Sequence, residues 1–140
     1  MPHNNGFTLT ELSAALAITA VVLTISVTKL PDVSRQQRLC REARRVQLLL
    51  DRAKGRSLAF GSAHTVSLRT GALELRNNTG VLLEKLPLSP YISVKTTSNL
   101  QGEVSFYPTH TATPGTLTIS LDSLAATLVV SLRGRTRVQC

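Results

Sequence analysis

The residue types best suited to bind a ligand stand at the end of the chain. Arg133, Arg135 and Arg137 alternate with Gly134 and Thr136, and no acidic residue lies among them. In an extended strand such arginines point to one side, about 6.7 Å apart, close to the axial rise of two nucleotides along one DNA strand. A guanidinium group binds phosphate oxygens through two hydrogen bonds, and Gly134 permits a tight turn or the close approach of a ligand. The tail is therefore either a phosphate-binding element or a terminal strand with solvated arginines.

A single carboxylate marks the N-terminal segment. Glu11 is the only formally charged residue before Lys29, and residues 12–27 are all apolar or small. A carboxylate beside such a run is costly in a bilayer and usually functional, because it needs a cationic partner. A secretory signal peptide would have a basic start and a small-residue cleavage site, and the sequence supplies neither. A plain membrane anchor explains the run but not Glu11.

The segment Gly6-Phe7-Thr8-Leu9-Thr10-Glu11 resembles the class III signal of type IV pilins and type II secretion pseudopilins. The resemblance implies that a prepilin peptidase cuts after Gly6 and that Phe7 becomes an N-methylated terminus. It also implies that Glu11 pairs with the N-terminal amine of a neighbouring subunit during assembly. Residues 1–6 would then be a leader and residues 7–30 a transmembrane and assembly helix. The positive-inside rule alone would keep the basic residues after this run in the cytoplasm, whereas the resemblance places them in the periplasm.

Residues 31–60 have the pattern of an amphipathic helix that continues into a globular domain. Pro31 predicts a kink or a short break, after which Asp32 or Ser34 could cap a new helical segment. Apolar residues recur at intervals of three and four, which is typical of one helix face: Leu39, Ala43, Val46, Leu50 and Ala53. A second face is basic and comprises Arg38, Arg41, Arg45, Arg52 and Arg56. This basic face is either solvated or in contact with filament neighbours or a polyanion.

Residues 61–132 change character and read as a β-rich domain. Turn-forming residues separate short β-prone segments, and these segments predict strands over residues 64–69, 72–76, 81–86, 91–95, 103–107, 115–121, 125–132 and 136–139. Alternating apolar residues in several of them indicate half-buried strands, as in Leu128, Val130 and Leu132. A long helix followed by antiparallel strands predicts an α+β, type IV pilin-like fold, whose helix has a transmembrane half and an amphipathic half.

The C-terminal half resembles the FimT/GspH pilin family over residues 104–108, 113–117 and 128–137. The family often has Gly in the turn where His110 stands here. Gly134-Arg135-Thr136-Arg137 resembles the Gly-Arg-x-Arg tail of FimT pilins linked to DNA uptake in natural transformation. The resemblance implies that residues 133–140 are a basic tail in which Arg133, Gly134, Arg135 and Arg137 bind DNA.

Composition limits the other functions. The net charge of +8 is concentrated between Lys29 and Arg56 and in the tail, and aromatic residues make up only 4%, which argues against nucleic-acid modules that stack bases on aromatic rings. Cys40 and Cys140 match no metal-ligand spacing. In an oxidising compartment they could bond to each other, stay free, or pair with another subunit. No grouping of histidines and carboxylates indicates an enzyme, a metal site or a cofactor.

These observations predict a minor pilin of a type IV pilus that binds duplex DNA non-specifically through its tail during uptake for natural transformation. The alternative is a structural or priming minor pilin, or a GspH-type pseudopilin of a type II secretion system, without DNA binding. The expected partners are DNA, other pilin subunits, the prepilin peptidase and, before assembly, the bacterial inner membrane. We expect a single-pass inner-membrane protein with a periplasmic globular domain, which then enters the pilus or pseudopilus.

Overall fold

The structure, a computed structural model, describes residues 8–97 and 102–140, with residues 25–32 described by their backbone alone. Within these residues a long helix, α1 (Leu9–Phe60), precedes eight strands. The chain divides into two compact units, Met1–Arg35 and Gln36–Cys140, and each is described by itself below.

The first unit holds the N-terminal part of α1, whose large apolar side chains are exposed on the isolated chain. Its described part contains eight of them: Leu9, Leu12, Leu16, Ile18, Val21, Val22, Leu23 and Val33. The sequence predicts a kink or a short break at Pro31. The helix continues through Pro31 without interruption, so the break is wrong and neither Asp32 nor Ser34 begins a new helix. A proline in a helix removes one backbone hydrogen bond, and this loss does not end α1.

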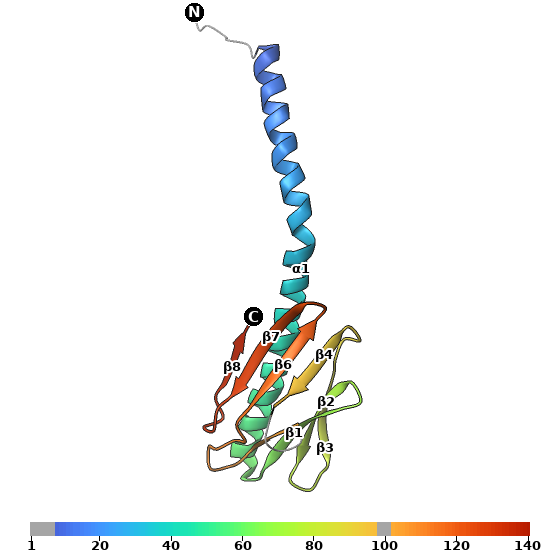
Figure 1. The fold of residues 1–140 in the computed structure, drawn as a ribbon. Coiled ribbons are helices and arrows are strands. Elements are labelled where there is room, and N and C mark those ends of the chain that lie inside the picture. Colours follow the sequence, from blue (N-terminus) through green and yellow to red (C-terminus); the bar gives the residue numbers. More distant parts are fainter. Residues whose placement is uncertain (1–7, 98–101) are drawn as a thin grey trace, which may run out of the picture. The chain divides into compact units, whose positions relative to one another are not determined.

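The second unit consists of the C-terminal part of α1 and two four-stranded antiparallel sheets (Figure 1). One sheet has the order β3-β2-β1-β5 and the other β4-β6-β7-β8. The strands are β1 (His64–Arg69), β2 (Ala72–Asn77), β3 (Leu82–Pro87), β4 (Ile92–Thr96), β5 (Glu103–Phe106), β6 (Gly115–Leu121), β7 (Leu124–Val130) and β8 (Thr136–Gln139). All eight predicted strands are confirmed to within two residues at each end, and the predicted α+β pilin-like fold is confirmed.

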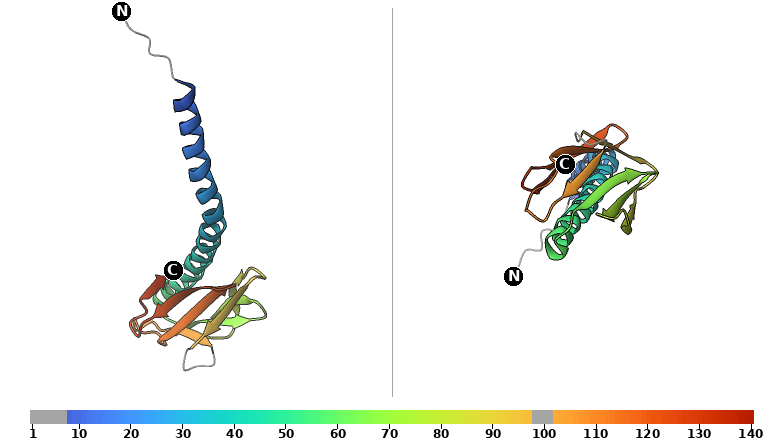
Figure 2. Two further views of the ribbon diagram at one scale, coloured as in Figure 1. Left: turned by 45° about the horizontal axis from the view of Figure 1, so that its top comes forward. Right: turned by 90° about the horizontal axis from the view of Figure 1, so that it is seen from below.

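Both sheets pack against one face of α1, as the two views in Figure 2 also show. The five apolar residues predicted for this face are all buried, and Leu49 joins them. Residues from both sheets, such as Leu75, Phe106 and Leu128, complete the core. Burial of so many aliphatic side chains supplies the main driving force for folding of this unit. Strand β8 stands at the outer edge of its sheet (Figure 1), where β7 is its only neighbouring strand.

Candidate nucleic-acid interface

The predicted DNA-binding tail forms the last hairpin of the second sheet. Strand β8 pairs antiparallel with β7, in a register that sets Thr136 opposite Val130 and Arg137 opposite Val129. A tight turn joins the two strands, in which the Gly134 amide donates to the Ser131 carbonyl at 2.8 Å and the Arg135 amide donates to Ser131 Oγ at 3.1 Å. The basic tail is therefore an ordered strand edge.

Two of the three tail arginines lie together on the exposed face of this hairpin. Arg135 and Arg137 line a surface hollow of about 300 Å³, together with Val129, Ser131 and Gln139. Both arginines are exposed, and no carboxylate among the described residues lies within ion-pair distance of either. Their guanidinium groups are thus available to an anion in solvent.

Arg133 does not share this face, so the one-sided arrangement expected if all three arginines were extended does not form. It stands in the turn beside Leu132, which is 62% exposed. Strand β7 ends at Val130, so the predicted extension of this strand to Leu132 is also wrong. The reason is the turn itself, because hydrogen bonds to the backbone and side chain of Ser131 close it before an extended strand can form.

Gly134 shapes this turn. Its φ angle is +64°, in the left-handed region that side chains disfavour. The residue is also buried, and a Cβ atom there would lie 3.5 Å from Cδ1 of Phe106 and 3.6 Å from Cδ of Lys54. Of the two roles considered for this glycine, the tight turn is therefore the one that the geometry supports.

Strand β8 is also tied to α1. The Thr136 hydroxyl donates to Asp51 Oδ1 at 2.8 Å, and Gln47 Nε2 donates to the same hydroxyl oxygen at 3.4 Å. Because Thr136 lies between Arg135 and Arg137 and points to the other face of the strand, these bonds orient the two arginines away from the helix.

The predicted basic face of α1 is divided by ion pairs. Arg45 bonds Glu42 at 2.8 Å, and Arg52 and Arg56 both contact Glu84 of β3. Arg52 and Arg56 therefore link α1 to β3, whereas the Arg45 pair lies within the helix. The positive charges of the other two members, Arg38 and Arg41, are exposed and meet no carboxylate in the part of the chain that the structure describes.

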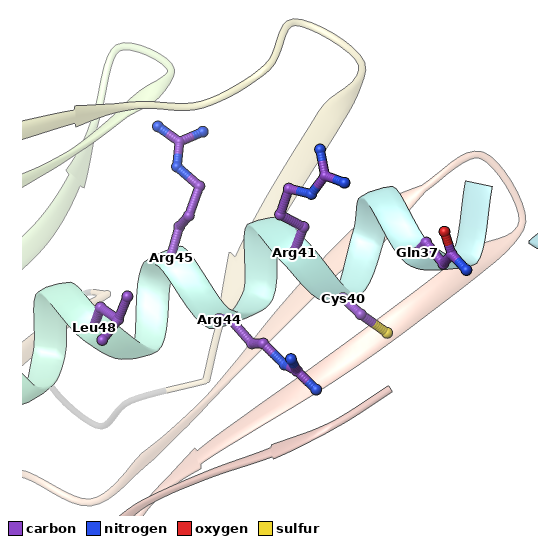
Figure 3. Close-up of a pocket in the computed structure, with 6 residues that line it drawn as sticks. All are labelled: Gln37, Cys40, Arg41, Arg44, Arg45 and Leu48. Carbon is purple, nitrogen blue, oxygen red and sulfur yellow. The ribbon is translucent and has the colours of Figure 1, made fainter. Parts of the chain in front are cut away.

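Arg44 is a basic residue that the helical pattern missed. Together with Gln37, Cys40, Arg41, Arg45 and Leu48 it lines a hollow of about 480 Å³. In Figure 3 the Arg44 and Cys40 side chains extend toward β7 and β8, whereas Arg41 and Arg45 extend to the opposite side. No sequence signal singles out Arg44, because its proximity to the end of the chain depends on how β8 packs.

The structure brings the two cysteines together at this place. Both are free thiols, Cys40 being half-buried and Cys140 exposed. Partial burial and the neighbouring Cys40 thiol raise the pKa of the Cys140 thiol to about 11, and the nearby Arg44 opposes this shift.

At the other end of the chain, Gly6 and Phe7 lie outside the described residues, whereas Glu11 is in the first turn of α1. The Glu11 carboxylate accepts hydrogen bonds from the Thr8 amide and the Thr8 hydroxyl, both at 2.9 Å. The Glu11 amide in turn donates to Thr8 Oγ1 at 3.3 Å. This is a capping box, in which both residues satisfy free donors at the start of a helix. Its Thr-x-x-Glu spacing is visible in the sequence.

Comparison with known proteins agrees with the N-terminal motif and with the fold. Residues 1–27 match the family model of the prokaryotic N-terminal methylation motif. The fold matches two crystal forms of the type IV minor pilin FimU from Pseudomonas aeruginosa. The first has a TM-score of 0.64 at 17% identity and covers 75% of this chain and 90% of FimU. The second has a TM-score of 0.60 at 18% identity, with 73% and 93% covered.

The fold is that of a type IV minor pilin. Residues 9–27 of the methylation motif lie in the first part of α1, and the tail hairpin lies at the opposite end of the sequence. A search of curated proteins found no significant match. Within the described residues, no helix is long and apolar enough to span a bilayer, and the transmembrane role of residues 7–30 stays a prediction.

Proposed function

We propose that this protein is a minor pilin of a type IV pilus that binds duplex DNA non-specifically through its C-terminal hairpin during DNA uptake. The observation that carries the proposal is the placement of Arg135 and Arg137, which lie side by side on an exposed hollow and have no competing carboxylate among the described residues. The resemblance of the tail to that of FimT pilins supplies the biological context.

The geometry suits phosphate contacts. Two residues along a strand separate the arginines by about 6.7 Å, so each guanidinium can reach a different phosphate of one DNA strand. Contacts of this kind position DNA without reading its sequence. The affinity should therefore depend on salt and be indifferent to base composition. The unpaired Arg38 and Arg41 of α1 could add weaker contacts to a long duplex.

The test is a titration of labelled duplex DNA with a fragment of residues 29–140, followed by fluorescence anisotropy. All core residues lie within Gln36–Cys140, so the fragment keeps the folded domain. Replacing both Arg135→Gln and Arg137→Gln should lower the affinity about tenfold or more. It should also reduce the slope of log affinity against log salt by about two.

A matched control removes the same charge elsewhere. Arg69→Gln with Lys95→Gln takes two exposed positive charges from β1 and β4 and should change the affinity only slightly. If the two double variants bind DNA equally well, the tail is not the binding site. If the unmodified fragment shows no salt-dependent binding at all, the DNA-binding function itself is wrong.

The second candidate is a structural role in assembly, as a priming minor pilin or a type II secretion pseudopilin. The exposed apolar residues of the first unit favour it, since a row from Leu9 to Leu23 needs a bilayer or neighbouring helices to cover it. In this case deletion abolishes filaments or secretion, whereas the tail variants assemble normally. In both cases we propose an N-terminal leader of residues 1–6, processing at Gly6 and Phe7, and residence in the inner membrane before assembly.

A further inference from the structure

The free end of β8 lies beside the middle of α1, although a hundred residues separate the two segments in sequence. Thr136 is fixed to Asp51 and Gln47 by hydrogen bonds. From Thr136 to Cys140 an extended chain advances about 13 Å, and from Gln47 back to Cys40 the helix advances about 10 Å. Figure 1 shows β8 running along α1 toward the segment that contains residue 40. Cys140 on β8 and Cys40 on α1 therefore lie at a similar height along the helix axis, next to each other.

The side chains complete this approach. In Figure 3 the Cys40 sulfur points away from the helix, toward the side on which β7 and β8 lie. The Cys140 thiol is close enough to Cys40 for a hydrogen bond between the two side chains, and it also lies near Arg44. Cys40 lines the hollow beside Arg44, so an oxidant in solvent can reach the pair.

We propose that Cys40 and Cys140 form a disulfide bond that locks β8 to α1 and thereby holds Arg135 and Arg137 in their binding positions. The step joins the two sulfur atoms and removes one hydrogen from each thiol. The two electrons pass to a disulfide oxidant, such as oxidised glutathione, which is reduced to two thiols. The pairing of the two cysteines rests on the structure and their oxidation on the proposed export to the periplasm, whereas the effect on binding rests on the proposed DNA-binding function.

The reason for such a lock is the weakness of this strand. Strand β8 has four residues and pairs with β7 on one side only, at the edge of its sheet. Short edge strands of this kind open locally at low free-energy cost. A bond between residues 40 and 140 would link β8 covalently to α1 and enclose most of the globular domain in one covalent loop. If the hydrogen bonds of β8 opened, the strand would still be held next to its sheet. Periplasmic exposure, which the proposed export route provides, favours this oxidation.

The first experiment identifies the bond in the full-length protein, purified in detergent from the envelope after alkylation of free thiols without reductant. Proteolysis and mass spectrometry should find one linked peptide pair containing Cys40 and Cys140, which separates on reduction. The single variants Cys40→Ser and Cys140→Ser should each leave one alkylated thiol. Recovery of both thiols alkylated, or a covalent dimer in place of the internal bond, would overturn the proposal.

The second experiment measures what the bond does. Hydrogen exchange of the β8 amides should be slower in the oxidised protein than after reduction, and the Cys40→Ser, Cys140→Ser double variant should exchange like the reduced protein in both conditions. Reduction should weaken DNA binding about two- to fivefold, because only a fraction of molecules then holds the tail in place. The double variant, as control, should not respond to reductant.

The two proposals fail in different ways. Slower exchange in the oxidised protein without any DNA binding supports the lock and refutes the DNA-binding function. Salt-dependent DNA binding with equal exchange before and after reduction supports DNA binding and refutes the lock.

Discussion

Individual residues in left-handed backbone conformations identify where this chain stores strain. His110 has a φ angle of +60°, in the turn that follows β5, at the position where the related family often has glycine. The turn therefore has the backbone that glycine would adopt, at a cost of about 1 kcal/mol for a residue with a side chain.

Replacement of His110→Gly should relieve this strain. We expect the free energy of unfolding to rise by about 0.5–1 kcal/mol, as measured by chemical denaturation of the 29–140 fragment. Asn78→Gly is the matched control, because Asn78 is an exposed turn residue outside the left-handed region, where glycine only adds freedom to the unfolded chain. Equal effects of both substitutions would show that the strain at His110 is absent in solution.

The thiol of Cys140 predicts a dependence of stability on pH in the reduced protein. Its pKa is raised from an ordinary value of 9.0 to about 11 by partial burial and by the Cys40 thiol. A group with a raised pKa binds its proton more tightly in the folded state. Its contribution is therefore complete below pH 9 and is lost as the pH rises through about 11.

Thermal unfolding of the reduced protein should therefore show a fall in stability across this alkaline window that is larger than in Cys140→Ser. Subtracting the two profiles removes the titration of the tyrosines and lysines, which both proteins share. Identical profiles would mean that Cys140 is fully solvated.

The residues of the candidate site differ in how far the sequence could predict them. Arg135 and Arg137 were predictable, because alternation along a strand depends on local geometry alone. The same rule fails for Arg133, since the Ser131 side chain closes a turn there. Neither Arg44 nor the approach of the cysteines could be predicted, because both depend on the packing of β8 against α1.

The turn between β7 and β8 is the element that positions the tail arginines. Gly134→Ala places a side chain on a backbone with a φ angle of +64°, and it should destabilise the domain by about 1 kcal/mol. Because the Arg135 amide bonds Ser131 within this turn, the substitution should also shift Arg135 and weaken DNA binding.

Gly80→Ala provides a control with the same backbone penalty. Gly80 has a φ angle of +80° in the turn between β2 and β3, with no atom within 4 Å of an added Cβ. Both variants should lose similar stability in denaturation experiments, and only Gly134→Ala should lose affinity for DNA. A loss of affinity in both would indicate a general effect of destabilisation.

The sequence could locate those helices and strands whose own residues carry a clear pattern. Glycines and asparagines separate the strands clearly, and the apolar face of α1 follows its period of three and four residues. The break predicted at Pro31 was wrong because a proline removes one hydrogen bond, whereas the rest of the long helix keeps its own. The division into two sheets was not predictable, since it depends on which strands become neighbours, and pairing partners leave no mark in the pattern of a single strand.

At the scale of the whole molecule, the residues that stabilise the domain and the apolar residues exposed for contacts lie in different parts of the chain. The described core lies entirely within Gln36–Cys140, so the globular domain needs nothing from the first unit to fold. The exposed apolar residues of the first unit, from Leu9 to Leu23, contribute nothing to this core. Substitutions there should leave the stability of the domain unchanged and act only on association.

If this chain enters a filament as proposed, the capping box at the start of α1 makes that step an exchange of hydrogen-bond partners at Glu11. In the single chain the Glu11 carboxylate already holds two donors, both from Thr8. If a neighbour's terminal amine takes that carboxylate, Thr8 must release it, and the first turn of the helix gives up part of its cap. The free-energy gain at this position is then the difference between two interactions of Glu11, one with Thr8 and one with the neighbour's amine. This difference is small compared with the free energy of either interaction. Such a contact can select the correct register between subunits and still let a subunit leave. When the subunit leaves, its Glu11 carboxylate can again accept hydrogen bonds from Thr8 of its own chain.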